Sequence, residues 1–390
     1  MTNKIEKKSY ALPIAMMFAL FFMISFVTGL PSPMGVIVAK QFGASNFESQ
    51  LGFLANFIAY AFMGIPAGLM LKKIGYKKLA LVAVTVGFTG VGIQWLSGQV
   101  GSFTVYLIGA FVAGFSMCML NTVVNPMLNT LGGGGNKGNQ LIQWGGTINS
   151  SAATIVPILV GYLMGDVAGR TIDKASPALF IAMGIFALAF IVLFIVDIPE
   201  PHIQKVSEKK VKDTHSPLSF RHFILGAIAI FIYVGIEVGI PSTANLFMTA
   251  LPSAANPGLG IDAGTAGIVV GIYWLLMLVG RLVGASVGAK ISSKTMLTFA
   301  SSVAMVFILL AIFMPVSTTI NMPVITNTFS FAQVQVPVNV LFIILCGLCT
   351  SIMWGGIFNL AVEGLGKYTA AASGLFMVMV CGGGLIPVLQ

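Results

Sequence analysis

Long apolar segments separated by short charged or Gly/Pro-rich breaks occupy most of the chain. A helix needs about 20 mostly apolar residues to cross the hydrocarbon of a bilayer. The segments are continuous and do not alternate with polar residues, so they indicate helices and not the strands of a membrane barrel. Eleven membrane spans are therefore predicted, at 10–39, 49–71, 79–97, 102–130, 140–164, 178–198, 222–251, 263–289, 295–316, 337–363 and 368–390.

One charged stretch, 199–221, is longer than the other breaks and follows the sixth predicted span. It divides the chain into an N-terminal six-helix half (1–198), a cytoplasmic central loop (199–221) and a C-terminal half (222–390). Many transporters are built from two such halves with a substrate site between them. On this plan we expect two pseudo-symmetric six-helix halves, and we expect the last helix to be absent because the chain ends in the eleventh span.

Composition supports a membrane protein and excludes a soluble enzyme. The chain is 57% hydrophobic and 8% charged, against about 25% charged in soluble domains. Its net charge of +9 does not indicate nucleic-acid binding, because the cations follow the positive-inside rule. With the N-terminus in the cytoplasm, 17 of the 20 Lys and Arg residues lie inside, and the three outside are Lys40, Arg170 and Lys174. We expect a bacterial inner-membrane protein in this orientation.

The break between the second and third spans carries glycines and lysines in a recognisable pattern. It is similar to the glycine-plus-basic loop of the major facilitator superfamily, in which cations cap helix C-termini and pair with acids across the bundle. A related pattern follows the eighth span, so we interpret Arg281 as part of this loop system and not as a substrate ligand. The predicted structural or gating residues are Gly68, Lys72, Lys73, Gly75, Lys77 and Arg281.

Several segments narrow the resemblance. They are Asn125-Pro126, the stretch 143–150, the stretch 233–238, the stretch 351–360 and the glycine run 382–384. Together they resemble the fucose–galactose–glucose:proton symporter family. The resemblance implies a monomeric twelve-helix sugar symporter that works by alternating access, but it does not fix the substrate.

The chain departs from this family at two acidic positions. In the family that this chain resembles, the proton-linked members carry an Asp at the position of Ser32 and a Glu at the position of Asn121. Asn149 matches the family's asparagine in the fifth span. The resemblance therefore supports a sugar site more strongly than proton coupling through the family's usual acids.

Amide side chains recur at helical spacing. Asn121 and Asn125 lie four residues apart and share one helix face, and Gln143 and Asn149 add amides in the next span. An amide both donates and accepts hydrogen bonds, as a sugar hydroxyl does. Hydrogen bonds between helices are the alternative role for each of them.

Glu237 is the only acid deep within a predicted span. A charge at the bilayer centre is unfavourable by at least about 2.5–3.5 kcal/mol, so this side chain should face a cavity, pair with a cation or take up a proton. A coupling proton, a sugar hydroxyl, Na⁺ held with amide oxygens, or a fixed hydrogen bond across the bundle would each account for it.

Aromatic side chains complete the predicted substrate site. A ring face can stack on the apolar face of a sugar, although packing or lipid contact is the alternative. Trp144 adjoins the motif of the fifth span, and Trp354 that of the tenth. The predicted substrate-binding residues are Asn121, Asn125, Gln143, Asn149, Trp144, Tyr233, Glu237, Trp354 and Asn359, with Glu237 also the coupling residue.

No Walker loop or catalytic motif is present, so neither ATP hydrolysis nor an enzyme is indicated. The predicted function is secondary active transport of a neutral mono- or amino-sugar, coupled to H⁺ or Na⁺, with no cofactor, metal site or nucleic-acid partner. A multidrug or metabolite exporter with the same fold is the alternative, and it would need a mostly apolar cavity.

Overall fold

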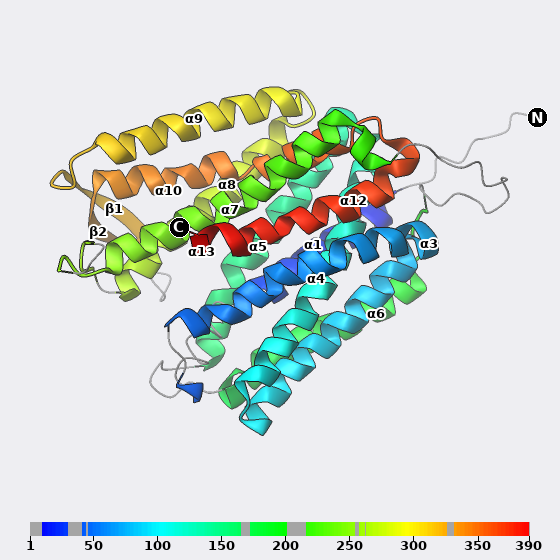
Figure 1. Cartoon of the computed structure of the whole chain (residues 1–390), viewed down its shortest axis with the longest axis horizontal. Coiled ribbons are helices and arrows are strands. Elements are labelled where there is room, and N and C mark those ends of the chain that lie inside the picture. The colour runs from blue at the N-terminus through cyan, green and yellow to red at the C-terminus, as the bar shows by residue number, and fades with distance from the viewer. Residues whose placement is uncertain are drawn as a thin grey trace, which may run out of the picture.

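The computed structural model describes residues 10–29, 41–43, 46–164, 172–200, 216–253, 257–261, 263–325 and 331–389. Long helices form one bundle, and a β-hairpin lies at one end of it (Figure 1). The helices are α1 (Ala11–Gly29), α3 (Asn46–Val100), α4 (Phe103–Leu131), α5 (Gly135–Met164), α6 (Ile172–Ile195), α7 (Arg221–Thr249), α8 (Ala263–Val287), α9 (Ser293–Phe313), α10 (Val338–Thr350), α11 (Met353–Val362), α12 (Thr369–Val378) and α13 (Gly382–Leu389).

The helices follow the predicted spans closely. Within the described ranges, nine segments are long and apolar enough to cross a membrane. One of them combines the second and third spans, because α3 contains two helices that meet at Gly75 (φ 83°, ψ 177°). The tenth span is divided into α10 and α11, and the eleventh into α12, a 3-10 segment at Met379–Cys381 and α13.

The helix that begins after Gly75 is capped by an acid from the segment that follows α6. Its first backbone N–H groups have no partners within the helix. The Glu200 carboxylate accepts from the N–H of Tyr76 at 2.7 Å and of Lys77 at 3.0 Å. Lys77 also pairs with Asp197 at 3.5 Å, which confirms a cation–acid pair at this loop. The expected capping of a helix C-terminus by these lysines is wrong for Lys77, whose side chain points to an acid instead.

We predict that Glu200→Ala lowers the free energy of unfolding by about 1–2 kcal/mol, because it removes both charge-assisted bonds to the helix N-terminus. Thermal unfolding in detergent measures the effect. Asp197→Ala is the matched control, since its ion pair with Lys77 lies at an exposed carboxylate and is expected to matter little. Equal shifts in Tm for the two variants would contradict the capping role.

An antiparallel hairpin that the span pattern did not predict connects α9 to α10. It consists of β1 (Thr319–Ile325) and β2 (Phe331–Pro337), with Thr319 opposite Pro337 and Ile325 opposite Phe331. Alternate residues Met322, Val324 and Val336 are buried against the ends of α7 and α8. The hairpin therefore covers one end of the C-terminal helices with its apolar face.

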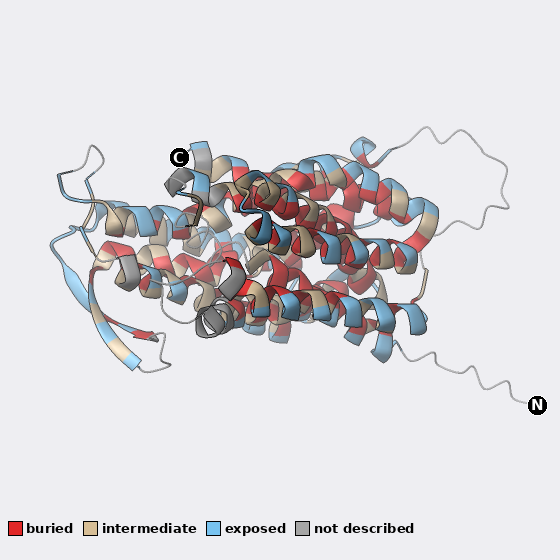
Figure 2. Ribbon diagram, turned by 90° about the horizontal axis from the view of Figure 1, so that it is seen from below, coloured by how far each residue is buried: buried red, intermediate tan, exposed pale blue. Residues whose placement is uncertain are grey.

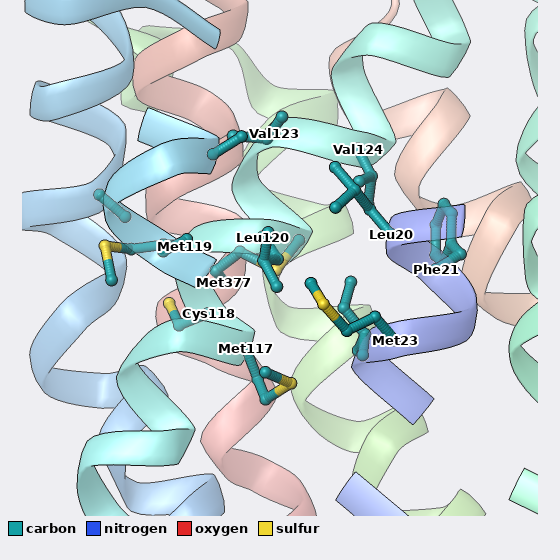
Figure 3. Packing of buried hydrophobic residues seen from close by; sticks show 14 of the residues in the cluster. Leu20, Phe21, Met23, Met117, Cys118, Met119, Leu120, Val123, Val124 and Met377 are labelled. Atoms are coloured by element: carbon teal, nitrogen blue, oxygen red, sulfur yellow. The ribbon is translucent and has the colours of Figure 1, made fainter. Parts of the chain in front are cut away.

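The bundle interior is apolar and closely packed. Figure 3 shows α1 and α4 meeting through side chains such as Leu20, Met23, Leu120 and Val124, all of which are buried. Figure 2 shows exposed residues along the outer faces of the helices. Many of these are large and apolar, including Phe313, which is 79% exposed. Such a surface suits contact with lipid acyl chains.

The two ends of the bundle differ in charge. One end, which we call the lysine end, carries exposed lysines in and beside the loops that join α4 to α5, α8 to α9 and α11 to α12, and around the Gly75 joint of α3. The hairpin lies at the other end, the hairpin end (Figure 1). The exposed lysines of the lysine end are Lys72, Lys73, Lys78, Lys137, Lys290, Lys294 and Lys367.

Glycines bring α3 and α12 into backbone contact near the lysine end. A Cβ atom added to Gly374 would lie 2.5 Å from the Gly64 carbonyl oxygen and 2.6 Å from the Gly68 Cα. Gly68 thus lies on a packed helix face, and not in the loop where its motif suggested. The contact joins the two predicted halves of the chain.

Candidate functional site

Polar side chains of α4 and α5 form hydrogen bonds with groups of α8 and α11 and with the backbone between α10 and α11, from the middle of the bundle toward the lysine end. These groups meet because each helix carries its amides or its arginine on the face that contacts the opposite half. We call the hydrogen bonds that cross between the halves here the lysine-end contacts. They involve four of the nine residues predicted to bind substrate, namely Asn125, Gln143, Trp354 and Asn359.

The amide series of α4 is buried and connected along the helix. Asn121 donates to the Tyr60 hydroxyl at 3.0 Å and to the Met117 carbonyl at 3.1 Å. Asn125 donates to the Asn121 carbonyl at 2.9 Å. Tyr60, on α3, was not among the predicted residues, although a tyrosine with its hydroxyl inside a span is a polar signal of the same kind.

Trp354 joins the two halves through its indole. Its Nε1–H donates to the Asn125 side-chain oxygen at 3.0 Å. Its ring meets Phe376 of α12 edge-on, with the centroids 6.2 Å apart. Trp354 and Asn125 are thus brought together as a pair, with the ring partly buried.

Asn359 takes part in a chain of side-chain bonds close to the lysine end. Asn129 donates to its oxygen at 2.6 Å, and its own amide donates to the Ser293 hydroxyl at 2.9 Å. These bonds connect α4, α11 and the start of α9. Asn129 and Asn359 also line a hollow beside the glycine loop between α4 and α5.

At the break between α10 and α11, polar side chains of other helices donate to backbone carbonyls. Gln143 of α5 donates to the Ile352 carbonyl at 2.8 Å. Arg281 donates through Nε to the Ser351 carbonyl at 3.1 Å. A helix break inside a membrane requires such partners, because no lipid group can satisfy a free carbonyl. The break is therefore part of the site.

Arg281 lies inside the bundle, so its assignment to the basic loop is wrong. Helix α8 continues to Val287, beyond Arg281. The guanidinium NH1 donates to the Gly146 carbonyl at 3.1 Å and to the Ser150 hydroxyl at 2.6 Å, both on α5. Its NH2 donates to Glu237 Oε1 at 3.2 Å. The two charged side chains are only 10% and 13% exposed.

Two tyrosines flank this ion pair. Tyr233 lies one helical turn before Glu237 on α7 and is buried. The Tyr273 hydroxyl of α8 lies 2.9 Å from that of Thr350 and donates to the Glu237 carbonyl at 3.2 Å. Tyr273 was not among the predicted residues. The pair therefore lies in a polar cluster built from α5, α7, α8 and α10.

Some predicted residues lie apart from this group. Asn149 donates to the Phe21 carbonyl of α1 at 2.9 Å, a bond within the N-terminal half. Trp144 is 37% exposed, while its neighbour Gln143 is 2% exposed, so the structure does not bring Trp144 to the site. Ser32 lies outside the described residues. In the described part of the chain, no three His, Cys, Asp or Glu residues gather as metal ligands would.

The sequence matches a known family over most of its length. The model described as the Major Facilitator Superfamily matches residues 17–387. The glucose/galactose transporter of Brucella abortus is 28% identical over 396 residues, which cover 100% of this chain and 89% of that protein. The L-fucose-proton symporter of Escherichia coli is 22% identical over 98% of this chain and 86% of its own.

Solved structures share the fold. The transporter FucP in its outward conformation matches with a TM-score of 0.78 at 20% identity, over 98% of this chain and 92% of FucP. The proton:xylose symporter XylE matches with a TM-score of 0.67 at 14% identity, over 97% and 86% of the two chains. These similarities confirm the predicted fold class, and with the apolar spans they establish an integral membrane protein. The chain belongs to the major facilitator superfamily.

Proposed function

We propose that this protein is a symporter that moves a neutral sugar across the bacterial inner membrane by alternating access. The named relatives support this proposal, since they are glucose/galactose transporters and fucose:proton symporters. The site chemistry also supports it. Amides, phenols and an indole surround the contact between the halves, and these groups suit hydroxyl-rich ligands.

The observation that carries the proposal is the charge balance of the site. Arg281 is the buried cation of the described spans, and Glu237 neutralises it at 3.2 Å. An anionic substrate would have to displace Glu237, whereas a neutral sugar need not. A multidrug exporter would call for a mostly apolar cavity, which does not fit the buried amides Asn121, Asn125 and Gln143.

We assign the lysine end to the cytoplasm, because cytoplasmic loops are rich in Lys and Arg. The halves are 1–198 and 222–390, the N-terminus is cytoplasmic and the protein acts as a monomer. On this assignment the lysine-end contacts close the cytoplasmic side. Asn125, Gln143 and Asn359 hold the halves together in this state, and they become free to bind sugar hydroxyls once the halves separate.

The coupling ion in our proposal is the proton. A carboxyl can carry one, and proton symport is named for FucP and XylE relatives. A sodium ion bound at Glu237 would lie next to the guanidinium that donates to the carboxylate at 3.2 Å, and the two cations would repel. The pair therefore favours H⁺ over Na⁺.

Uptake into proteoliposomes tests the function. Labelled glucose, galactose, fucose and N-acetylglucosamine are each supplied with an imposed pH gradient or with an imposed Na⁺ gradient. We expect one or more of these sugars to accumulate under the pH gradient alone. Accumulation only under the Na⁺ gradient would overturn the choice of ion. Absence of uptake by folded protein under both gradients would overturn the sugar assignment and favour the exporter.

A further inference from the structure

A row of side-chain hydrogen bonds runs from Trp354 of α11 through two amides of α4 to Tyr60 of α3. The Trp354 indole N–H donates to Asn125 Oδ1 at 3.0 Å, and Asn125 Nδ2 donates to Asn121 Oδ1 at 3.3 Å. Asn121 Nδ2 then donates to the Tyr60 hydroxyl oxygen at 3.0 Å. Every bond of the row has the same direction, and the row ends on an oxygen that still carries its own proton.

This direction is fixed by groups that can act in only one way. An indole nitrogen only donates, and a backbone carbonyl only accepts. The Met117 carbonyl lies 3.1 Å from the Asn121 side-chain nitrogen, a place that an amide oxygen could not occupy. Asn121 Nδ2 therefore faces both Met117 and Tyr60. Since Met117 and Asn121 belong to the same helix, this orientation does not depend on contact between the halves.

The Tyr60 hydroxyl is thus an acceptor toward Asn121, and its proton must point elsewhere. Tyr60 is 4% exposed. Among the described residues, its hydroxyl has no hydrogen-bond partner besides Asn121. Buried polar groups almost always have partners, and a buried donor without an acceptor is unfavourable. The free O–H therefore indicates an acceptor that the described chain does not supply.

Tyr60 lies where the two halves meet. One turn earlier on α3, the Phe57 ring lies 2.6 Å from a Cβ atom added to Gly383 of α13. One turn later, a Cβ atom added to Gly64 would lie 2.6 Å from the backbone nitrogen of Val378 on α12. Residues three and four apart share a helix face. Tyr60 is therefore on the face of α3 that contacts the C-terminal half, and a ligand between the halves can reach it once they separate.

We propose that Tyr60 is a specificity-determining residue of the sugar site, and that its hydroxyl proton is held for an acceptor oxygen of the bound sugar. This inference rests on the proposed function and names a feature that the substrate must have. A hydroxyl that is already an acceptor toward Asn121 can only donate to the ligand. A ligand without an oxygen at that position leaves the buried proton unpaired and should bind about tenfold more weakly.

The first experiment needs no sugar and tests whether the Tyr60 proton is free. The Tm of the full chain in detergent is measured for the parent protein, Tyr60→Phe and Tyr273→Phe. In Tyr60→Phe, one unpaired N–H of Asn121 replaces one unpaired O–H, so Tm should stay close to that of the parent. In Tyr273→Phe, the hydroxyl loses its bonds to the Glu237 carbonyl and to Thr350, so Tm should fall.

The second experiment tests whether the sugar supplies the acceptor. Labelled glucose, galactose, fucose and N-acetylglucosamine are bound to the purified protein, and the sugar with the lowest Kd is chosen. Analogues that each lack one oxygen, namely the monodeoxy sugars and the carba sugar without a ring oxygen, then compete with the label. Tyr60→Phe should bind the intact sugar about tenfold more weakly than the parent protein does. For one analogue the two proteins should bind alike, because the oxygen that accepts from Tyr60 is already missing.

Two results would overturn the proposal. A fall in Tm for Tyr60→Phe as large as that for Tyr273→Phe would show that the proton has an acceptor within the protein. A Tyr60→Phe protein that binds the intact sugar as tightly as the parent, or that is weakened equally for every analogue, would show that the hydroxyl does not donate to the sugar. If the parent binds none of the four sugars, the proposed function fails, whereas the Tm comparison still decides whether the Tyr60 proton is free.

Discussion

Sugar accumulation driven by a pH gradient is expected to fall by roughly tenfold or more in the Glu237→Gln variant. Glutamine keeps the size of the side chain and a hydrogen-bond acceptor for Arg281, but it cannot take up or release the coupling proton. Exchange of labelled for unlabelled sugar across the same vesicles should be partly kept, because that reaction does not require the proton to leave. Parallel assays of gradient-driven uptake and exchange in proteoliposomes measure both quantities.

Glu363→Gln is the matched control for this experiment. Glu363 is an exposed acid at the end of α11, and its replacement should leave gradient-driven accumulation close to that of the parent. If Glu237→Gln accumulates sugar as well as the control does, Glu237 is not the coupling residue. If it loses exchange as completely as accumulation, the side chain serves sugar binding or folding and not coupling.

Gly374→Ala is expected to slow transport by about tenfold or more, because the added methyl group prevents α12 from meeting α3. Its Cβ would lie 2.5 Å from a backbone oxygen at Gly64 and 2.6 Å from the Gly68 Cα, and these backbone atoms cannot rotate away as a side chain could. Overpacking of this kind destabilises the packed arrangement by about 1–3 kcal/mol. The added methyl group should mainly destabilise the state in which the lysine end is closed, because α3 and α12 belong to opposite halves.

Gly271→Ala is the control, since a Cβ at Gly271 on α8 meets nothing within 4 Å. Sugar exchange in vesicles gives the rate. The distance between spin labels at Lys137→Cys and Glu363→Cys, which are exposed at the lysine end on opposite halves, gives the extent of closure. We expect long distances for Gly374→Ala and short ones for Gly271→Ala. Normal closure in Gly374→Ala would show that α3 and α12 can shift without separating the halves.

In the candidate site, helical spacing predicts the burial of some polar side chains but not of others. Helical spacing places Asn121 and Asn125 on one face, and the structure finds both buried on that face. The sequence analysis placed both Gln143 and Trp144 in the predicted substrate site, whereas packing buries the first and exposes the second. Neighbouring residues on a helix point in different directions, and the position of the surrounding helices decides which direction is inside.

The sequence by itself determined the spans, the basic loops and the family. Each of these is encoded locally, because a membrane helix satisfies its own backbone hydrogen bonds and needs only an uninterrupted apolar segment. Thus α4 and α8 begin within one residue of their predicted starts, at Phe103 and Ala263. The hairpin of β1 and β2 was missed because its alternation is short and its apolar face depends on the helix ends it covers.

Only the tertiary structure decided which polar residues are partners. Arg281 and Glu237 are 44 positions apart, and Trp354 and Asn125 are 229 apart. No local period connects residues at such separations. In the sequence Arg281 lies close to a basic loop, and only the packing of α8 against α5 and α7 places it inside the bundle. A buried charge must find a counter-charge, and which one it finds depends on the packing of helices that are distant in sequence.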